Sequence, residues 1–226
     1  YFIIAFVSFF ALNSYAQTIE ERNVSKFNKI SVCCGINVYI TEGNSSKLTI
    51  ETNNEEFLDY IITEVKGDEL KISVKENRGK SFRKVTAKVS LEASNLKEIK
   101  STSGSGIYSV GKLNADNIEV NATSGSNIDL DIKAQNLTCK ATSGSDISLK
   151  GSADYAEVNA NSAGDIKMKD MTVKNAVAKA SSGADISLTV TDELKANANS
   201  GADIKYSGDP KNIIKSANSG GSIKKR

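Results

Sequence analysis

The chain has 226 residues, of which 39% are apolar, and its 29 Lys and Arg against 27 Asp and Glu leave a formal charge of +2. Lys and Asp are interspersed, so the sequence has no basic stripe of the kind that nucleic-acid binding requires. Histidine is absent, which excludes Ser-His-Asp and Cys-His catalysis and the usual zinc sites.

Residues 1–16 have the pattern of a secretory signal peptide. Residues 1–12 are apolar except for Ser8, and Ser14 and Ala16 supply small residues where a signal peptidase reads before Gln17. The apolar run is shorter than the roughly 20 residues that span a bilayer, and no later segment comes close. We therefore expect an exported protein, in the periplasm, on the outer surface or in the medium, that does not span a membrane.

Residues 17–100 are predicted to form irregular β coils or a small sheet that caps one end of the fold. Apolar residues alternate from Ile30 to Ile40. Further strands are predicted at 48–50, 70–74 and 85–91. The segment 53–61, NNEEFLDYI, is predicted to be a short helix because two Asn precede its acidic first turn. The polar, basic loop 77–83 is expected to be mobile.

Residues 101–226 repeat one motif seven times, from STSGSGI at 101–107 to ANSGGSI at 217–223. Each copy ends in an Ile three residues after a Gly or Ala: Ile107, Ile128, Ile147, Ile166, Ile186, Ile204 and Ile223. Between copies, apolar residues alternate with a period of two, which is typical of half-buried strands. The spacing of 18 to 21 residues, at about 3.3 Å per residue, gives a perimeter on the order of 60 Å, enough for three short strands and their turns.

This repeat predicts an all-β fold, a right-handed, single-stranded parallel β-helix, because each coil buries its inward face only by stacking on its neighbours. We expect seven regular coils over 101–226, with the less regular β region before them, in a single β-helical domain spanning 17–226. The charged tail 224–226 is expected to protect the strand edges at the far end.

Stacking places equivalent residues in columns. The Ile residues are predicted to point inward, as are Ala122, Ala141, Ala160, Ala180, Ala198 and Ala217. Gly is predicted at the corner, where it can adopt positive φ. Beside it runs a Ser column: Ser103, Ser124, Ser143, Ser162, Ser182, Ser200 and Ser219. These hydroxyls are predicted to bond turn amides locally, and no His or paired Lys is present to make them nucleophiles.

The three cysteines are Cys33, Cys34 and Cys139, an odd number that cannot form a complete disulfide framework. Cys34 and Cys139 share the inward parity of their apolar neighbours, so both are predicted to be small core residues. Cys33 is the cysteine that is expected to be exposed, and a functional thiol is the alternative interpretation.

One further column is acidic and is the candidate metal site. Asn127, Asp146, Asp165, Asp185 and Asp203 occupy one position in successive coils. Carboxylates stacked about 4.8 Å apart repel one another, and a bound cation would relieve the repulsion. The alternative is that each Asp accepts hydrogen bonds from turn amides.

Three segments together resemble a known family. They are GINVYITEG at 35–43, LDYIITEVKGDELKISV at 58–74, and the SGSxI repeats. In this order they resemble the head GIN domain family, also described as an auto-transporter adhesin head domain, and the resemblance covers nearly all of the mature chain. It implies a secreted or cell-envelope β-helical protein, and it implies neither catalytic residues nor a cofactor.

The first functional hypothesis is a non-enzymatic, adhesin-like interaction module without a cofactor, whose flank binds a glycan or an envelope or host protein. It depends on the outward columns of Thr102, Thr123, Thr142 and Ser181 and of Asn161, Asn199 and Asn218. One alternative is a polysaccharide lyase or hydrolase, although no repeat is extended enough to wall a cleft. Another is a structural spacer of the envelope. The sequence leaves the oligomeric state open.

Overall fold

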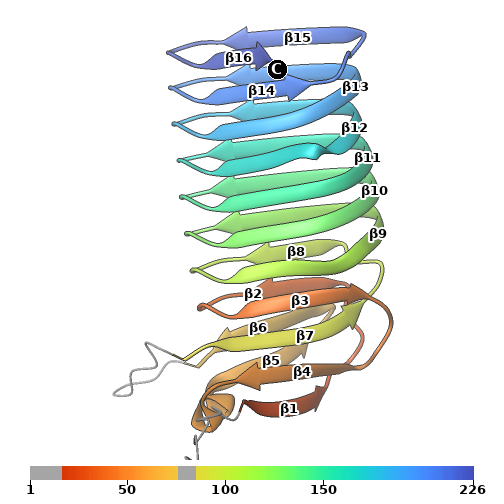
Figure 1. Cartoon of the computed structure of the whole chain (residues 1–226), viewed down its shortest axis with the longest axis vertical. Coiled ribbons are helices and arrows are strands. Elements are labelled where there is room, and N and C mark those ends of the chain that lie inside the picture. Colours follow the sequence, from red (N-terminus) through yellow and green to blue (C-terminus); the bar gives the residue numbers. More distant parts are fainter. Residues whose placement is uncertain (1–16, 76–84) are drawn as a thin grey trace, which may run out of the picture.

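The structure is a computed structural model that describes residues 17–75 and 85–226. The predicted signal peptide, 1–16, and the predicted mobile loop, 77–83, lie outside the described residues. The fold is all-β, a solenoid of stacked parallel coils with about seven turns, as predicted (Figure 1). The one helix among the described residues is a short 3-10 helix. It lacks the length and apolar character that crossing a bilayer requires.

Long strands form the regular part of the solenoid. They are β9 (Gly106–Thr123), β10 (Asn127–Thr142), β11 (Asp146–Asn161), β12 (Asp165–Ala180) and β13 (Asp185–Ala198). Neighbouring strands pair in parallel and in register, so that Ile147 lies between Ile128 and Ile166. This register is the one that the repeat predicted.

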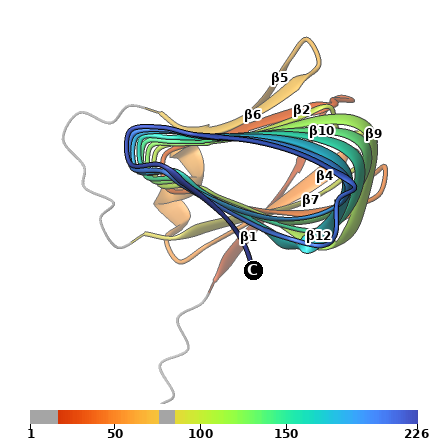
Figure 2. The same ribbon diagram turned by 90° about the horizontal axis from the view of Figure 1, so that it is seen from above.

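The prediction of three short strands per coil is wrong. Each regular coil is one strand of 14 to 18 residues, bent back on itself as seen along the axis in Figure 2. Register shifts between Asp129 and Asp131 and between Ser148 and Lys150 let the strand curve without leaving the ladder. Gly151 lies at this bend with φ +111°, and a Cβ there would approach the carbonyl oxygen of Ile132 to 2.2 Å.

The lumen of the solenoid is filled by the predicted columns. Six of the seven Ile residues are at most 1% exposed, and five of the six Ala residues are buried. The exceptions belong to the last coil, where Ile223 is half-buried and Ala217 is exposed. Ala217 nevertheless pairs in register with the inward residue Ala198, so its predicted direction agrees with the structure.

The tight turn at the other edge of each coil has two residues with positive φ. Every member of the Ser column has φ between +50° and +56°, and the following Gly or Ala is also left-handed. The hydroxyls of this column are exposed. The predicted bonds to turn amides are made instead by the buried serine two residues later, since Ser126 Oγ accepts from Thr123 N at 3.0 Å and Ser145 Oγ from Thr142 N at 3.0 Å.

Ala163 is the one non-glycine residue at its position in the seven turns, with φ +60°. A left-handed conformation costs a Cβ-bearing residue about 1–2 kcal/mol. Glycine avoids this cost, but its greater entropy in the unfolded chain offsets part of the gain in stability. We expect Ala163→Gly to raise the free energy of unfolding by about 1 kcal/mol, measured by urea denaturation.

The matched control is Gly183→Ala, one coil further on. Gly183 has φ +68°, and a Cβ there would meet no atom within 4 Å, so this change tests the backbone conformation alone. It should lower the urea midpoint by as much as Ala163→Gly raises it. A lower midpoint for Ala163→Gly would refute the explanation.

The N-terminal strands continue the solenoid and then close it. They are β1 (Thr18–Asn23), β2 (Lys29–Val32), β3 (Asn37–Glu42), β4 (Lys47–Thr52), β5 (Ile61–Lys66), β6 (Glu69–Val74), β7 (Ala87–Ala93) and β8 (Glu98–Ser101). β3 pairs in parallel with β7 and β9, while β2 pairs in parallel with β6 and β8. β4 pairs with β7, β1 with β4 and β5 with β6 in antiparallel fashion, and the β5–β6 hairpin projects from the coils in Figure 2.

The predicted short helix is present as the 3-10 helix η1 (Glu55–Tyr60). Its Phe57 is 6% exposed and belongs to the core, so it helps to close this end of the solenoid. Arg22 connects β1 to η1 and β5 in the cap, because its guanidinium donates hydrogen bonds to the carbonyl oxygens of Ile61 at 2.6 Å and Leu58 at 2.9 Å. The sequence prediction of a capping region at 17–100 is consistent with this arrangement.

The C-terminal end contains β14 (Asp203–Ser207), β15 (Asn212–Ala217) and β16 (Ser222–Lys225). Lys215 pairs in register with the inward residue Ala196, so its side chain lies over the lumen. Its Nζ donates to the hydroxyl of Tyr206 at 2.7 Å and lies 4.5 Å from the ring centroid. Lysines at inward positions discourage further strands from adding, so Lys215 joins the predicted tail 224–226 in protecting this edge.

Candidate functional site

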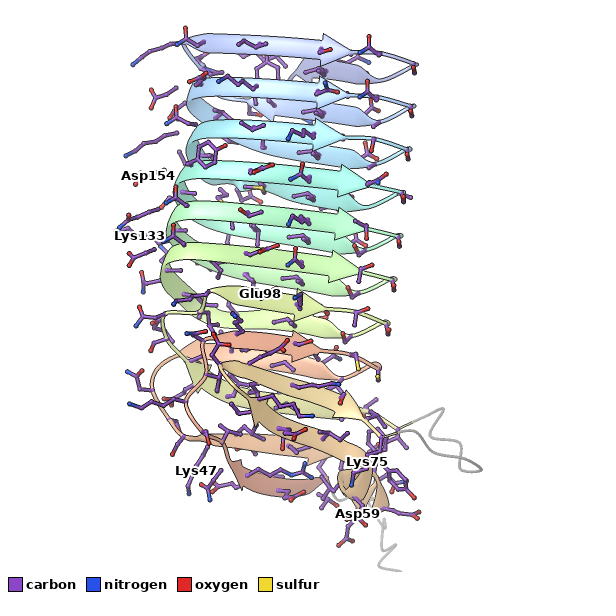
Figure 3. The ribbon with its side chains drawn as sticks, turned by 180° about the vertical axis from the view of Figure 1, so that it is seen from behind. Lys47, Asp59, Lys75, Glu98, Lys133 and Asp154 are labelled. Atoms are coloured by element: carbon purple, nitrogen blue, oxygen red, sulfur yellow. The ribbon has the colours of Figure 1, made fainter. Side chains whose placement is uncertain are left out.

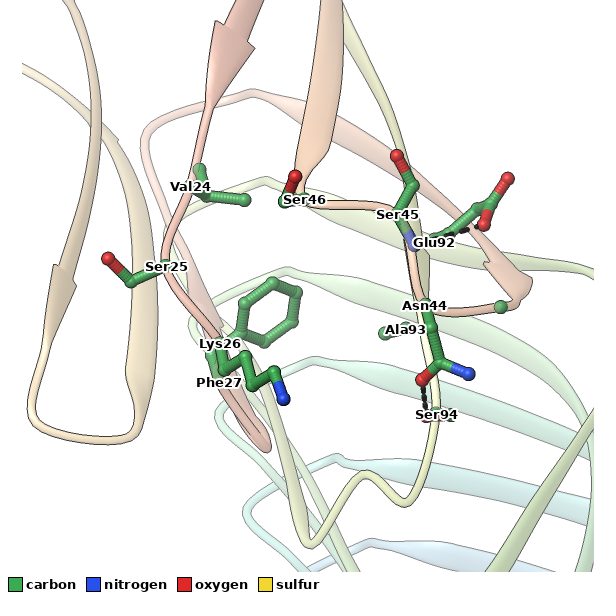
Figure 4. A pocket seen from close by; sticks show the side chains of 11 residues that line it. Val24, Ser25, Lys26, Phe27, Asn44, Ser45, Ser46, Glu92, Ala93 and Ser94 are labelled. Carbon is green, nitrogen blue, oxygen red and sulfur yellow. Dashed lines mark hydrogen bonds between the residues drawn. The ribbon is translucent and has the colours of Figure 1, made fainter.

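A hollow lies beside the cap, outside the regular coils. It has a volume of about 400 Å³ and is enclosed by three segments: 24–27 between β1 and β2, the turn 43–46 between β3 and β4, and 92–94 at the end of β7 (Figure 4). Two backbone hydrogen bonds hold these segments together. Val24 N donates to the oxygen of Ser46 at 2.8 Å, and Gly43 N to the oxygen of Ala93 at 3.2 Å.

The floor of the hollow is apolar. Val24 and Phe27 are both half-buried against the core, and Ala93 is buried. Figure 4 shows the aromatic ring of Phe27 directed into the space between the segments. An aromatic ring that is half-buried in this way offers one face to a bound molecule while its edge stays anchored in the protein.

The rim of the hollow is polar and carries a positive and a negative side chain, Lys26 and Glu92. Its hydroxyl, amide and charged side chains come from Ser25, Lys26, Asn44, Ser45, Ser46, Glu92 and Ser94. Glu92 Oε2 accepts a hydrogen bond from Ser45 N at 3.1 Å, and Ser94 Oγ is hydrogen-bonded to Asn44 Oδ1. A Cβ on Gly43 would come within 2.3 Å of Glu92 Oε2, so glycine is required for this carboxylate to lie against the turn.

The predicted acidic column is brought together on one face, but a lysine lies within it. Lys167 Nζ is 2.9 Å from Asp165 Oδ2 and 3.2 Å from Asp146 Oδ1. Hydrogen bonding to Asp165, and after it to Asp146, raises the pKa of Lys167 above its ordinary value. Further along, Asp185 lines a shallow hollow of about 210 Å³ together with Lys205 and Arg226. In 17–75 and 85–226, no three acidic or thiol groups converge on one point that could hold a metal ion.

The outward columns of Thr, Ser and Asn lie beside the tight turns, as predicted. Thr123 Oγ1 and Thr142 Oγ1 of neighbouring coils are 3.1 Å apart, and Ser181 Oγ donates to Asn161 Oδ1 at 3.1 Å. These groups therefore bond to one another along the stack.

The flat flank before each turn is also internally paired. Lys140 Nζ lies 2.8 Å from Glu119 Oε1, and this bond together with that from Asn121 lowers the pKa of Glu119. Charged residues such as Lys133 and Asp154 project from the bend (Figure 3). The flank is a regular polar surface with shallow hollows of about 210 and 260 Å³.

The cysteine predictions are correct for one residue and wrong for another. Cys139 is fully buried, and burial raises the pKa of its thiol strongly. Cys34 is exposed, not inward, because it lies in a tight turn with φ +69° that resets the alternation between β2 and β3. Cys33 is half-buried, and burial first, then Cys34, raises its pKa to about 11.

Sequence reasoning did not find the hollow. Its residues are separated by as much as 70 positions in the chain, from Val24 to Ser94, and they meet only because β3 and β7 pair. The one local signal is the run Gly43, Asn44, Ser45, Ser46, which is a polar turn next to a strand.

A family profile described as "Putative auto-transporter adhesin, head GIN domain" matches residues 26–210 of the chain. The matched residues include all three segments of the hollow except its first two positions. No curated protein matches the chain.

Several solved structures share this fold. A putative adhesin from Bacteroides fragilis is 22% identical, with a TM-score of 0.85 over 94% of this chain and 98% of its own. A putative lipid binding protein from Parabacteroides distasonis is 24% identical, with a TM-score of 0.74 over 93% and 96%. A putative adhesin from Parabacteroides merdae is 19% identical, with a TM-score of 0.72 over 93% and 96%.

Proposed function

The chain belongs to the head GIN domain family, and from this premise we propose that it is an exported, non-enzymatic binding module. Its partner is a glycan, and the hollow beside the cap is the place where a sugar unit binds. The hollow carries the proposal because it combines an aromatic floor with a rim of hydrogen-bonding groups.

The size of the hollow suits one or two sugar rings. Its volume of about 400 Å³ is near the lower limit of the roughly 300–1,000 Å³ of small-molecule sites. The apolar face of a sugar ring would lie on Phe27, whose ring points into the opening (Figure 4). The polar groups at the edge of the sugar ring would form hydrogen bonds with Asn44, Lys26 and Glu92. These three side chains together supply both donors and acceptors.

The regular flank is the less favourable place for the same partner. Its Glu, Lys, Thr and Asn side chains already bond to one another, as in Glu119 with Lys140, so a ligand there would have to replace existing bonds. In the hollow, the ring of Phe27 is half-buried, packs against the core and lines the opening. The combination of an apolar floor with a polar rim therefore favours the hollow over the flank.

Glycan arrays followed by calorimetry test this proposal. We expect saturable binding that falls at least about tenfold in Lys26→Ala, which corresponds to about 1.4 kcal/mol, and further in Phe27→Ala. Lys26 is exposed, so its replacement should leave the melting temperature unchanged. The matched control, Lys140→Ala on the flank, should bind as the unaltered chain does. Equal losses in the two lysine variants, or no saturable glycan on the array, would contradict the proposal.

A further inference from the structure

The turn between β2 and β3 carries two adjacent cysteines at positions where the seven repeat turns of 101–226 have hydroxyl or amide side chains. Cys34 and Gly35 have φ of +69° and +75°, close to the +54° and +70° of Ser103 and Gly104 in the next coil. Gly35 N donates to the oxygen of Ser103 at 3.2 Å, so the two turns are stacked directly. Cys34 thus occupies the exposed tip of the turn, in line with the Ser column.

The geometry of this turn brings neighbouring side chains together. In two of the three coils that carry Thr and Ser at the same positions, the hydroxyl oxygens of Thr102 and Ser103, and of Thr123 and Ser124, are 3.4 Å apart. Cys33 and Cys34 occupy the same two positions of this turn, so their thiols belong to neighbouring side chains at its tip. A bond between the two sulfur atoms closes a small ring and requires the backbone of the turn to adjust.

We propose that Cys33 and Cys34 are a redox modification site, a dithiol that hydrogen peroxide converts into a disulfide between the adjacent residues, which a thiol reductant converts back. The sulfur of Cys34, which is exposed, attacks the peroxide, so that one oxygen is transferred to the sulfur and the other leaves as water. The Cys33 sulfur then attacks the resulting sulfenic acid and a second water leaves. Two thiols lose two electrons and two protons, and one peroxide is reduced to two waters.

The environment assigns these roles to the two thiols. Cys34 is exposed and accessible to the peroxide, whereas Cys33 is half-buried. The disulfide is expected to be easily reduced, because adjacent Cα atoms are about 3.8 Å apart, less than the roughly 4.4–6.8 Å of ordinary disulfides. The third cysteine takes no part, since Cys139 is fully buried within β10.

Mass spectrometry of the full chain tests the proposal in a Cys139→Ala background. Alanine fits there because Ala178 and Ala196 occupy the equivalent inward position. After treatment of the reduced protein with one equivalent of hydrogen peroxide, we expect each chain to lose two hydrogen atoms and both alkylation sites for iodoacetamide. Dithiothreitol should restore both.

Two variants in that background separate the roles. Cys33→Ser should keep one added oxygen on Cys34, which dimedone traps, and should not lose the two hydrogen atoms. Cys34→Ser should remain unmodified at the same peroxide concentration. The proposal is overturned if the parent protein gains two or three oxygen atoms at Cys34 without losing hydrogen, forms disulfides only between chains, or does not react.

Discussion

Ile147→Ala is expected to lower the free energy of unfolding by about 2–5 kcal/mol, the largest effect of any single change proposed for the regular coils. Ile147 is completely buried and lies in register between Ile128 and Ile166, so its truncation leaves a cavity that neither neighbour can fill without moving its own strand. Urea denaturation followed by circular dichroism measures the loss.

The control for this variant is the next residue along the same strand. Ser148 faces outward, and Ser148→Ala removes one hydroxyl from the surface, so its effect should stay within about 0.5 kcal/mol. If the two variants had equal effects, the predicted alternation of inward and outward residues in β11 would be wrong.

Arg22→Ala is expected to destabilise the cap by about 2–4 kcal/mol, because each hydrogen bond from a charged group contributes about 1.5–3 kcal/mol and two carbonyl groups lose their donor. The Arg22 guanidinium donates to Ile61 O, Leu58 O and Thr63 Oγ1, and it also pairs with Glu20. Its side chain is only 21% exposed, so water replaces these bonds poorly.

Hydrogen exchange distinguishes a loss in the cap from a loss in the whole chain. In Arg22→Ala, amides of η1 and β5 should exchange faster, while those of β10 to β12 should keep their protection, because coils of a solenoid contact mainly their neighbours. Lys47→Ala is the control, since the Lys47–Glu21 pair is more than half exposed on both sides and contributes little. An effect of Lys47→Ala as large as that of Arg22→Ala would contradict this account of the cap.

The regular coils were predictable because their information is local and repeated. A period of 18 to 21 residues with Ile at one position specifies both the stacking and the inward face. The same pattern recurs in all seven copies, so each copy supports the same prediction. What the repeat does not contain is the shape of the coil. The bend at Gly151 depends on register shifts between neighbouring strands, and these are properties of pairs of coils that no single repeat reveals.

The N-terminal half was less predictable because its contacts are not repeated. Alternation from Ile30 to Ile40 hid a tight turn, since Cys34 keeps the apolar parity in the sequence while its left-handed backbone turns the side chain outward. β1 and β5 were missed because their exposed edges carry polar residues. The hollow was missed because Phe27 and Glu92 become neighbours only through the pairing of β3 with β7.

The membership of the family directs attention to binding, and the fold divides the surface into two kinds of region. The coils from β9 to β13 offer a flank whose polar groups are already paired, as in Lys167 between Asp146 and Asp165. The cap offers the hollow around Phe27, where an aromatic face and several polar groups converge. We propose that the hollow beside the cap binds the glycan and that the coils support the cap.

Hydrogen–deuterium exchange of the full chain, with and without the glycan that the array identifies, tests this assignment most directly. We predict protection of the backbone amides of 24–27, 43–46 and 92–94, with the flank strands β10 to β12 unchanged. Protection confined to those flank strands, with none around the hollow, would contradict it.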